Sequence, residues 1–122
     1  SDVLRFCPKD FILLSGDDFT SMPTALIGGK GVISVVSSVD PAGMAKMMEA
    51  AMSGDLKTAN QEHYRLFTMM KLMFKSASPG PAKKALKLMG RIQDDSPRLP
   101  MTPADEPTIQ ALKAEMSSLG ML

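Results

Sequence analysis

The sequence predicts an α/β fold whose second half is purely helical, and three observations support this prediction. A continuous apolar run at 11–14 and a run of apolar and β-branched residues at 31–36 alternate with helical patterns at 19–27 and from residue 41 onward. Asp40 followed by Pro41 is typical of a helix start. Beyond that helix, apolar side chains recur only at helical spacing, which indicates a helical extension.

The first elements are short. Residues 1–6 predict a helical piece that ends before Pro8, because proline disfavours helix in the residue before it. The runs at 11–14 and 31–36 predict strands buried on both faces, as in parallel sheets covered by helices. Asp17 or Asp18 is expected to cap a helix at 19–27. Two such strands leave their edges open, so we expect them to need partners that this chain does not supply.

The helices of the second half each carry one apolar face. After the helix that starts at Pro41 and ends near Gly54, Asp55 is expected to cap the longest helix, at 56–75. A third helix should end at Gly90, and a proline-rich link leads to a final one. The predicted faces are Met44, Met47, Met48 and Ala51; Leu56, Ala59, His63, Leu66, Phe67, Met70, Met73 and Phe74; Ala82, Ala85, Leu86 and Met89; and Ile109, Leu112, Met116 and Leu119.

Length, charge and cysteine content restrict the function classes. The 122 residues predict one unit, and a formal net charge of +1 provides no general attraction to nucleic acid or to an anionic membrane. No apolar run reaches the length of a membrane-spanning helix, and no signal peptide is recognised at the start. The single cysteine, Cys7, fits a reducing compartment. We therefore expect a cytoplasmic protein with no nucleic-acid and no membrane partner.

Local motifs provide no catalytic set. The GGKG turn at 28–31 departs from a phosphate-binding loop, which has Ser or Thr after the lysine. Asp17 and Asp18 lack a third metal ligand nearby, so helix capping is the favoured interpretation and no metal is expected. His63 on an apolar face indicates packing rather than catalysis.

Lysine and methionine clusters also have simple interpretations. Lys83, Lys84, Lys87 and Arg91 surround a short helix, which is typical of a solvated face. The 12 methionines predict adaptable core packing, with an interface for a partner as the alternative.

Two motifs at a fixed separation resemble a known family. LLSGDD at 13–18, followed by GGKGVISV at 28–35, is similar to a pair in the dihydrodipicolinate synthase and N-acetylneuraminate lyase group of Schiff-base aldolases. The resemblance covers essentially all 122 residues, and RLPMTP at 98–103 favours the dihydrodipicolinate synthase branch. It implies the C-terminal part of a (β/α)₈ TIM barrel, with the last βα units at 1–53 and a C-terminal helical domain at 54–122.

The resemblance also implies a binding pocket. Gly16 and Ile33 match family residues that line the pyruvate site, Ile33 through its backbone carbonyl, and a glycine leaves room for substrate. The family's Schiff-base lysine is expected upstream of Ser1, and neither Lys9 nor Lys30 matches it. We therefore expect no catalytic residue in this chain and no activity of the chain alone.

The complete enzyme, by this resemblance, would condense pyruvate with L-aspartate 4-semialdehyde through a lysine imine in lysine biosynthesis. Neither a metal nor an organic cofactor is implied, and a homo-oligomer, commonly a tetramer, is expected. Two alternatives stay open. One is a noncatalytic helical or oligomerisation module, and the other is part of a sister Schiff-base aldolase such as N-acetylneuraminate lyase.

Overall fold

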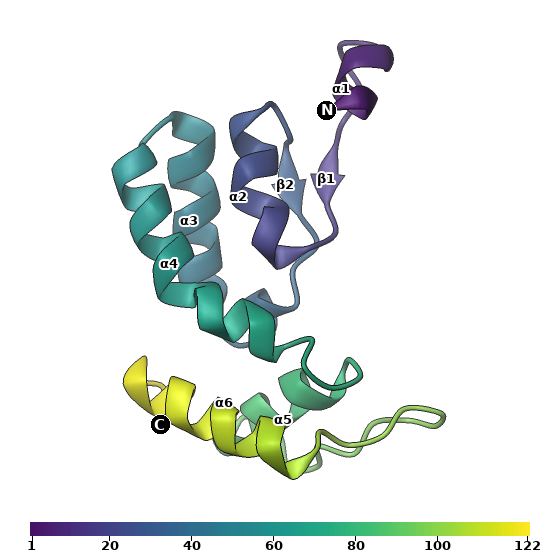
Figure 1. The fold of residues 1–122 in the computed structure, drawn as a ribbon, viewed down its shortest axis with the longest axis vertical. Coiled ribbons are helices and arrows are strands. Elements are labelled where there is room, and N and C mark those ends of the chain that lie inside the picture. The colour runs from purple at the N-terminus through teal and green to yellow at the C-terminus, as the bar shows by residue number, and fades with distance from the viewer.

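The computed structural model describes residues 1–122, and its first half alternates strands with helices (Figure 1). The elements of this half are α1 (Asp2–Phe6), β1 (Leu14–Ser15), α2 (Asp18–Leu26), β2 (Gly31–Val32), the 3₁₀ turn η1 (Val36–Ser38) and α3 (Pro41–Ser53). The second half contains α4 (Leu56–Leu72), α5 (Gly80–Leu88) and α6 (Glu106–Ser118). The predicted α/β order and the helical extension are confirmed. None of the helices combines the length and the apolar character needed to cross a bilayer.

The two strands pair in parallel, with Leu14 opposite Gly31 and Ser15 opposite Val32. α2 connects them and lies against both strands and α3 (Figure 1). This arrangement is a βαβ unit, in which the carboxyl ends of both strands lie at the same edge of the sheet.

The strands are shorter and more exposed than predicted. Phe11 and Ile12 lie outside β1, and their side chains are 46% and 68% exposed. β2 stops at Val32 instead of continuing to residue 36. The prediction of two strands buried on both faces is wrong, because each strand has only one neighbouring strand and α2 is the main element packed against the sheet.

Helix starts follow the predicted capping chemistry. Asp40 and Asp55 accept hydrogen bonds from the backbone amides of Gly43 and Thr58, and these two caps are confirmed. Before α2, Asp17 is the cap. α3 ends at Gly54, whose φ of 84° lies in the left-handed region that glycine adopts without strain.

The core lies mainly between α3 and α4. Met44, Met47, Met48 and Ala51 of α3 are all at most 8% exposed, as predicted. The predicted face of α4 is wrong at its ends, where Leu56 and Phe74 are 51% and 46% exposed. Leu56 is the first residue of α4 and Phe74 follows its end, so neither lies on the packed middle of the helix. Because α3 packs directly on α4, the core continues across residues 53 and 54. The division into barrel units at 1–53 and a helical domain at 54–122 stays a prediction.

The lysines of α5 do not form a free solvated face. Lys84 and Lys87 both pair with Asp95, and Lys83 donates a hydrogen bond to the Ser96 carbonyl oxygen. These contacts hold the proline-rich link beside α5. Lys87 remains exposed, as predicted, whereas the Lys84 side chain is only 21% exposed, so the prediction of a solvated face is wrong for Lys84. α5 and α6 lie side by side at the far end of α4 (Figure 1).

Candidate functional site

Gly16 and Ile33 come together at one edge of the small sheet. Gly16 directly follows β1, and Ile33 directly follows β2. The Ile33 amide donates a hydrogen bond to the Ser15 carbonyl oxygen over 2.8 Å. The carboxyl ends of parallel strands are where binding sites form in folds of this kind. The two residues are thus adjacent, and their role in binding stays a prediction.

The space beside Gly16 is open in this chain. A Cβ atom added at Gly16 would meet no atom within 4 Å, and its φ is not in the left-handed region. By contrast, a Cβ at Gly29 would lie 2.6 Å from Thr24 Cγ2. Packing therefore explains Gly29, whereas neither packing nor backbone conformation within this chain explains Gly16.

Asp18 links the two strand ends and was not anticipated in this role. Its side chain is completely buried, and Oδ2 accepts hydrogen bonds from the amides of Val35, at 3.1 Å, and Val36, at 3.2 Å. Oδ1 is buried without a partner. One aspartate, Asp17, is enough to cap α2. The presence of a second aspartate beside it was therefore the feature of the sequence that could have indicated another role for Asp18.

The glycine turn before β2 uses its amides within the chain. Gly28, Gly29 and Lys30 donate to the carbonyl oxygens of Ala25, Thr24 and Leu13, over 3.1, 2.8 and 2.8 Å. These three amides are therefore not available to a phosphate group. The φ of 113° at Gly28 requires glycine for the turn itself.

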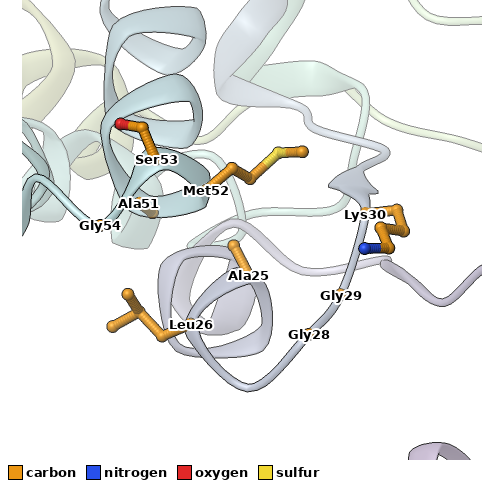
Figure 2. A pocket seen from close by; sticks show the side chains of 9 residues that line it. All are labelled: Ala25, Leu26, Gly28, Gly29, Lys30, Ala51, Met52, Ser53 and Gly54. Carbon is orange, nitrogen blue, oxygen red and sulfur yellow. The ribbon is translucent and has the colours of Figure 1, made fainter.

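A hollow of about 390 Å³ lies beside this turn (Figure 2). Figure 2 shows Ala25 pointing from α2 toward the end of α3, and Lys30 following the glycine turn. Lys30 directly precedes β2, whereas Ile33 follows it. The hollow therefore lies at the amino end of β2, away from the edge that carries Gly16 and Ile33. Its lining is Ala25, Leu26, Gly28, Gly29, Lys30, Ala51, Met52, Ser53 and Gly54.

His63 is a packing residue in an aromatic cluster. Its ring centroid lies 5.6 Å from that of Phe67 and 5.5 Å from that of Tyr64. Burial lowers the pKa of His63, which favours the neutral form of the ring. No group of three His, Cys, Asp or Glu side chains is arranged to hold a metal ion.

The match to a protein family extends over almost the whole chain. The family model described as "Dihydrodipicolinate synthetase family" matches residues 1–119. The chain belongs to this family. A 4-hydroxy-tetrahydrodipicolinate synthase of Desulfotalea psychrophila, a curated relative, is 59% identical over all 122 residues. A synthase of the same name from Archaeoglobus fulgidus is 42% identical over the same length. The chain covers 41% and 42% of these two relatives, or about two fifths of their length.

Solved structures of the dihydrodipicolinate synthetase family share the fold of this chain. The dihydrodipicolinate synthase of Aquifex aeolicus has a TM-score of 0.93 and 30% identity, over 98% of this chain and 41% of its own. That of Thermotoga maritima has a TM-score of 0.89 and 38% identity, over 93% of this chain and 38% of its own. These barrel structures confirm the predicted fold class, part of a TIM barrel with helices following it.

Proposed function

We propose that this chain is the C-terminal part of a 4-hydroxy-tetrahydrodipicolinate synthase. The observation that carries the proposal is the set of relatives with this name, which match all 122 residues at up to 59% identity. The proposed substrates are pyruvate and L-aspartate 4-semialdehyde, and the proposed pathway is lysine biosynthesis. Gly16 and Ile33 are proposed as walls of the pyruvate pocket, which fits their position after two adjacent parallel strands.

The proposed chemistry requires a lysine amine at this edge of the barrel. The amine adds to the C2 carbonyl of pyruvate and releases water; the imine then accepts the electron pair left when C3 loses a proton. The resulting enamine attacks the aldehyde carbon. Lys9 and Lys30 both lie on the amino-terminal side of a strand, at the wrong end for this role. We therefore propose that the reactive lysine lies on an additional strand and that the 122 residues alone are inactive.

The pocket walls have distinct proposed roles. Gly16 leaves open the space that pyruvate would occupy, because a Cβ there would meet no atom of this chain within 4 Å. The Ile33 carbonyl oxygen can accept a hydrogen bond from the imine or from a catalytic water, and so orient it.

The proposed enzyme acts in the cytoplasm as a homo-oligomer, without a metal or organic cofactor. Oligomeric state requires measurement, because a relative of solved structure, 36% identical, is a monomeric dihydrodipicolinate synthase variant. Light scattering on the native gene product distinguishes a tetramer from a monomer.

Trapping with borohydride tests the proposed chemistry. The native gene product and the 122-residue chain are each incubated with pyruvate and borohydride, and their intact masses are measured. We expect one reduced pyruvate adduct on the native product and none on the chain. An adduct on the chain would refute its inactivity, and no adduct on the native product would refute the imine mechanism.

Two further measurements separate the alternatives. Faster turnover of N-acetylneuraminate than of L-aspartate 4-semialdehyde with pyruvate would favour the sister aldolase. A native reading frame that begins near Ser1 would favour the noncatalytic module.

A further inference from the structure

Asp18 supplies a cap that the chain following β2 lacks. η1 begins at Val36, and the residue before it, Val35, has an apolar side chain that cannot accept a hydrogen bond. The Asp18 carboxylate accepts hydrogen bonds from the amides of Val35 and Val36 instead, although it lies 17 and 18 residues earlier in the chain. A side-chain oxygen that accepts from these amides does what a capping residue at position 35 would otherwise do.

These hydrogen bonds fix the peptide that contains the Ile33 carbonyl. On one side of it, the Ile33 amide is bound to the Ser15 carbonyl oxygen over 2.8 Å. On the other side, the Val35 amide is bound to Asp18 Oδ2 over 3.1 Å. The carbonyl therefore lies between two anchors, one from the last residue of β1 and the other from the start of α2.

Gly16 lies between the same two anchors in the sequence. Ser15 directly precedes it, and Asp18 follows two residues later. Through these residues the two strand ends are joined by hydrogen bonds on both sides of the Ile33 carbonyl.

The environment of Asp18 is unusual for a structural residue. Its side chain is 0% exposed, it forms no ion pair, and Oδ1 has no hydrogen-bond partner. Buried polar atoms without a partner are rare in native proteins and concentrate where function constrains the residue.

We propose that Asp18 is a positioning residue that holds the Ile33 carbonyl oxygen in its place beside Gly16. This inference rests on the proposed function, in which that carbonyl orients the imine or the water that reacts. Asp18 acts through the backbone and does not touch the substrate.

Three variants of the native gene product test the proposal: Asp18→Ala, Asp18→Asn and Asp17→Asn. Asp17→Asn is the matched control, because asparagine still caps α2 and Asp17 forms no hydrogen bond with Val35 or Val36. The measurements are kcat, the pyruvate KM, the folded fraction, and hydrogen exchange at the amides of Val35 and Val36.

For Asp18→Ala, we expect kcat to fall by about a hundredfold, because a reacting group that is misplaced slightly loses rate to that extent. The pyruvate KM should change by less than about threefold, since the orienting contact matters in the transition state. Exchange at Val35 and Val36 should become faster. Asp18→Asn retains one acceptor oxygen, so its kcat should fall by only about fivefold. Asp17→Asn should retain the kcat and exchange rates of the parent.

A folded Asp18→Ala protein with the kcat of the parent would overturn the proposal, as would an equal loss in Asp17→Asn. If Asp18→Ala does not fold, Asp18→Asn decides: a lowered kcat in the folded protein supports the proposal, and an unchanged one overturns it. If the parent does not turn over pyruvate, the proposed function fails. The exchange measurement then still shows whether Asp18 holds the Ile33 segment.

Discussion

The guanidinium of Arg65 lies 2.7 Å from the carboxylate of Asp40, which stands 25 residues earlier in the chain. Arg65 also donates from Nε to Glu62 Oε2 over 2.6 Å, and Lys46 reaches Glu62 Oε1 over 2.7 Å. Burial raises the pKa of Glu62, but the hydrogen bonds from Lys46 and Arg65 more than offset this effect and lower it. Because Asp40 also caps α3, this ion network joins the start of α3 to α4.

Gly43→Ala should destabilise the protein through this network. An added Cβ would collide with Arg65 Nη2 and with the Asp40 carboxylate, so the ion pair would have to shift. We expect the free energy of unfolding to fall by about 1–3 kcal/mol, although alanine favours helix more than glycine. Urea denaturation of the native gene product measures the change. Gly16→Ala, where an added Cβ meets nothing, is the control and should stay within about 0.5 kcal/mol of the parent. Equal stability of the parent, Gly43→Ala and Gly16→Ala would show that the ion network tolerates the methyl group at residue 43.

Gly16→Ala should impair pyruvate binding without unfolding the protein. The added methyl group would occupy the open space beside residue 16, where pyruvate is proposed to bind. We expect the pyruvate KM to rise by at least about tenfold, because one extra methyl group in a fitted pocket has an effect of this size. Steady-state kinetics at saturating L-aspartate 4-semialdehyde provide the measurement. An unchanged KM would exclude residue 16 from the pocket wall.

Met47→Ala should cost much more stability than Met52→Ala. Both methionines belong to α3, but Met47 is 0% exposed within the core and Met52 is 53% exposed. Truncating Met47 leaves a cavity, so we expect a loss of about 2–5 kcal/mol. The loss for Met52 should be below about 0.5 kcal/mol, as for other surface substitutions. The difference between their urea midpoints tests the assignment of the core, and similar midpoints would contradict it.

Acidification should weaken the contact between the proline-rich link and α5. Hydrogen bonds from Lys84 and Lys87 lower the pKa of Asp95 below its usual value of 3.8 in the folded protein. The unfolded chain therefore takes up this proton first as the pH falls, and the stability that Asp95 contributes above about pH 4 is lost below it.

Asp95→Asn should reduce this pH dependence. We expect its thermal midpoint to fall less between about pH 5 and pH 3 than that of the parent. The control is Asp10→Asn, because Asp10 is exposed and forms no ion pair. Parallel pH profiles for the parent and Asp95→Asn would contradict the role of Asp95.

Features that depend on neighbouring residues could be predicted from the sequence. The caps at Asp40 and Asp55 follow from side-chain chemistry within three residues, and the buried face of Met44, Met47 and Met48 follows from helical spacing. Features that depend on distant neighbours were predicted less well. Phe11 and Ile12 have the composition of a buried strand, but burial requires adjoining strands that these residues do not encode.

The sequence by itself determined the order of the elements, the helix starts and the methionine core, because capping and periodicity act over a few residues. It also carried the motif pair that predicted Gly16 and Ile33 at the ends of two neighbouring strands. Only the tertiary structure decided that Ser15 binds the Ile33 amide and that Asp18 caps the Val35 segment. Those contacts join residues 17 or 18 positions apart, and they exist only because β1 and β2 pair in one register.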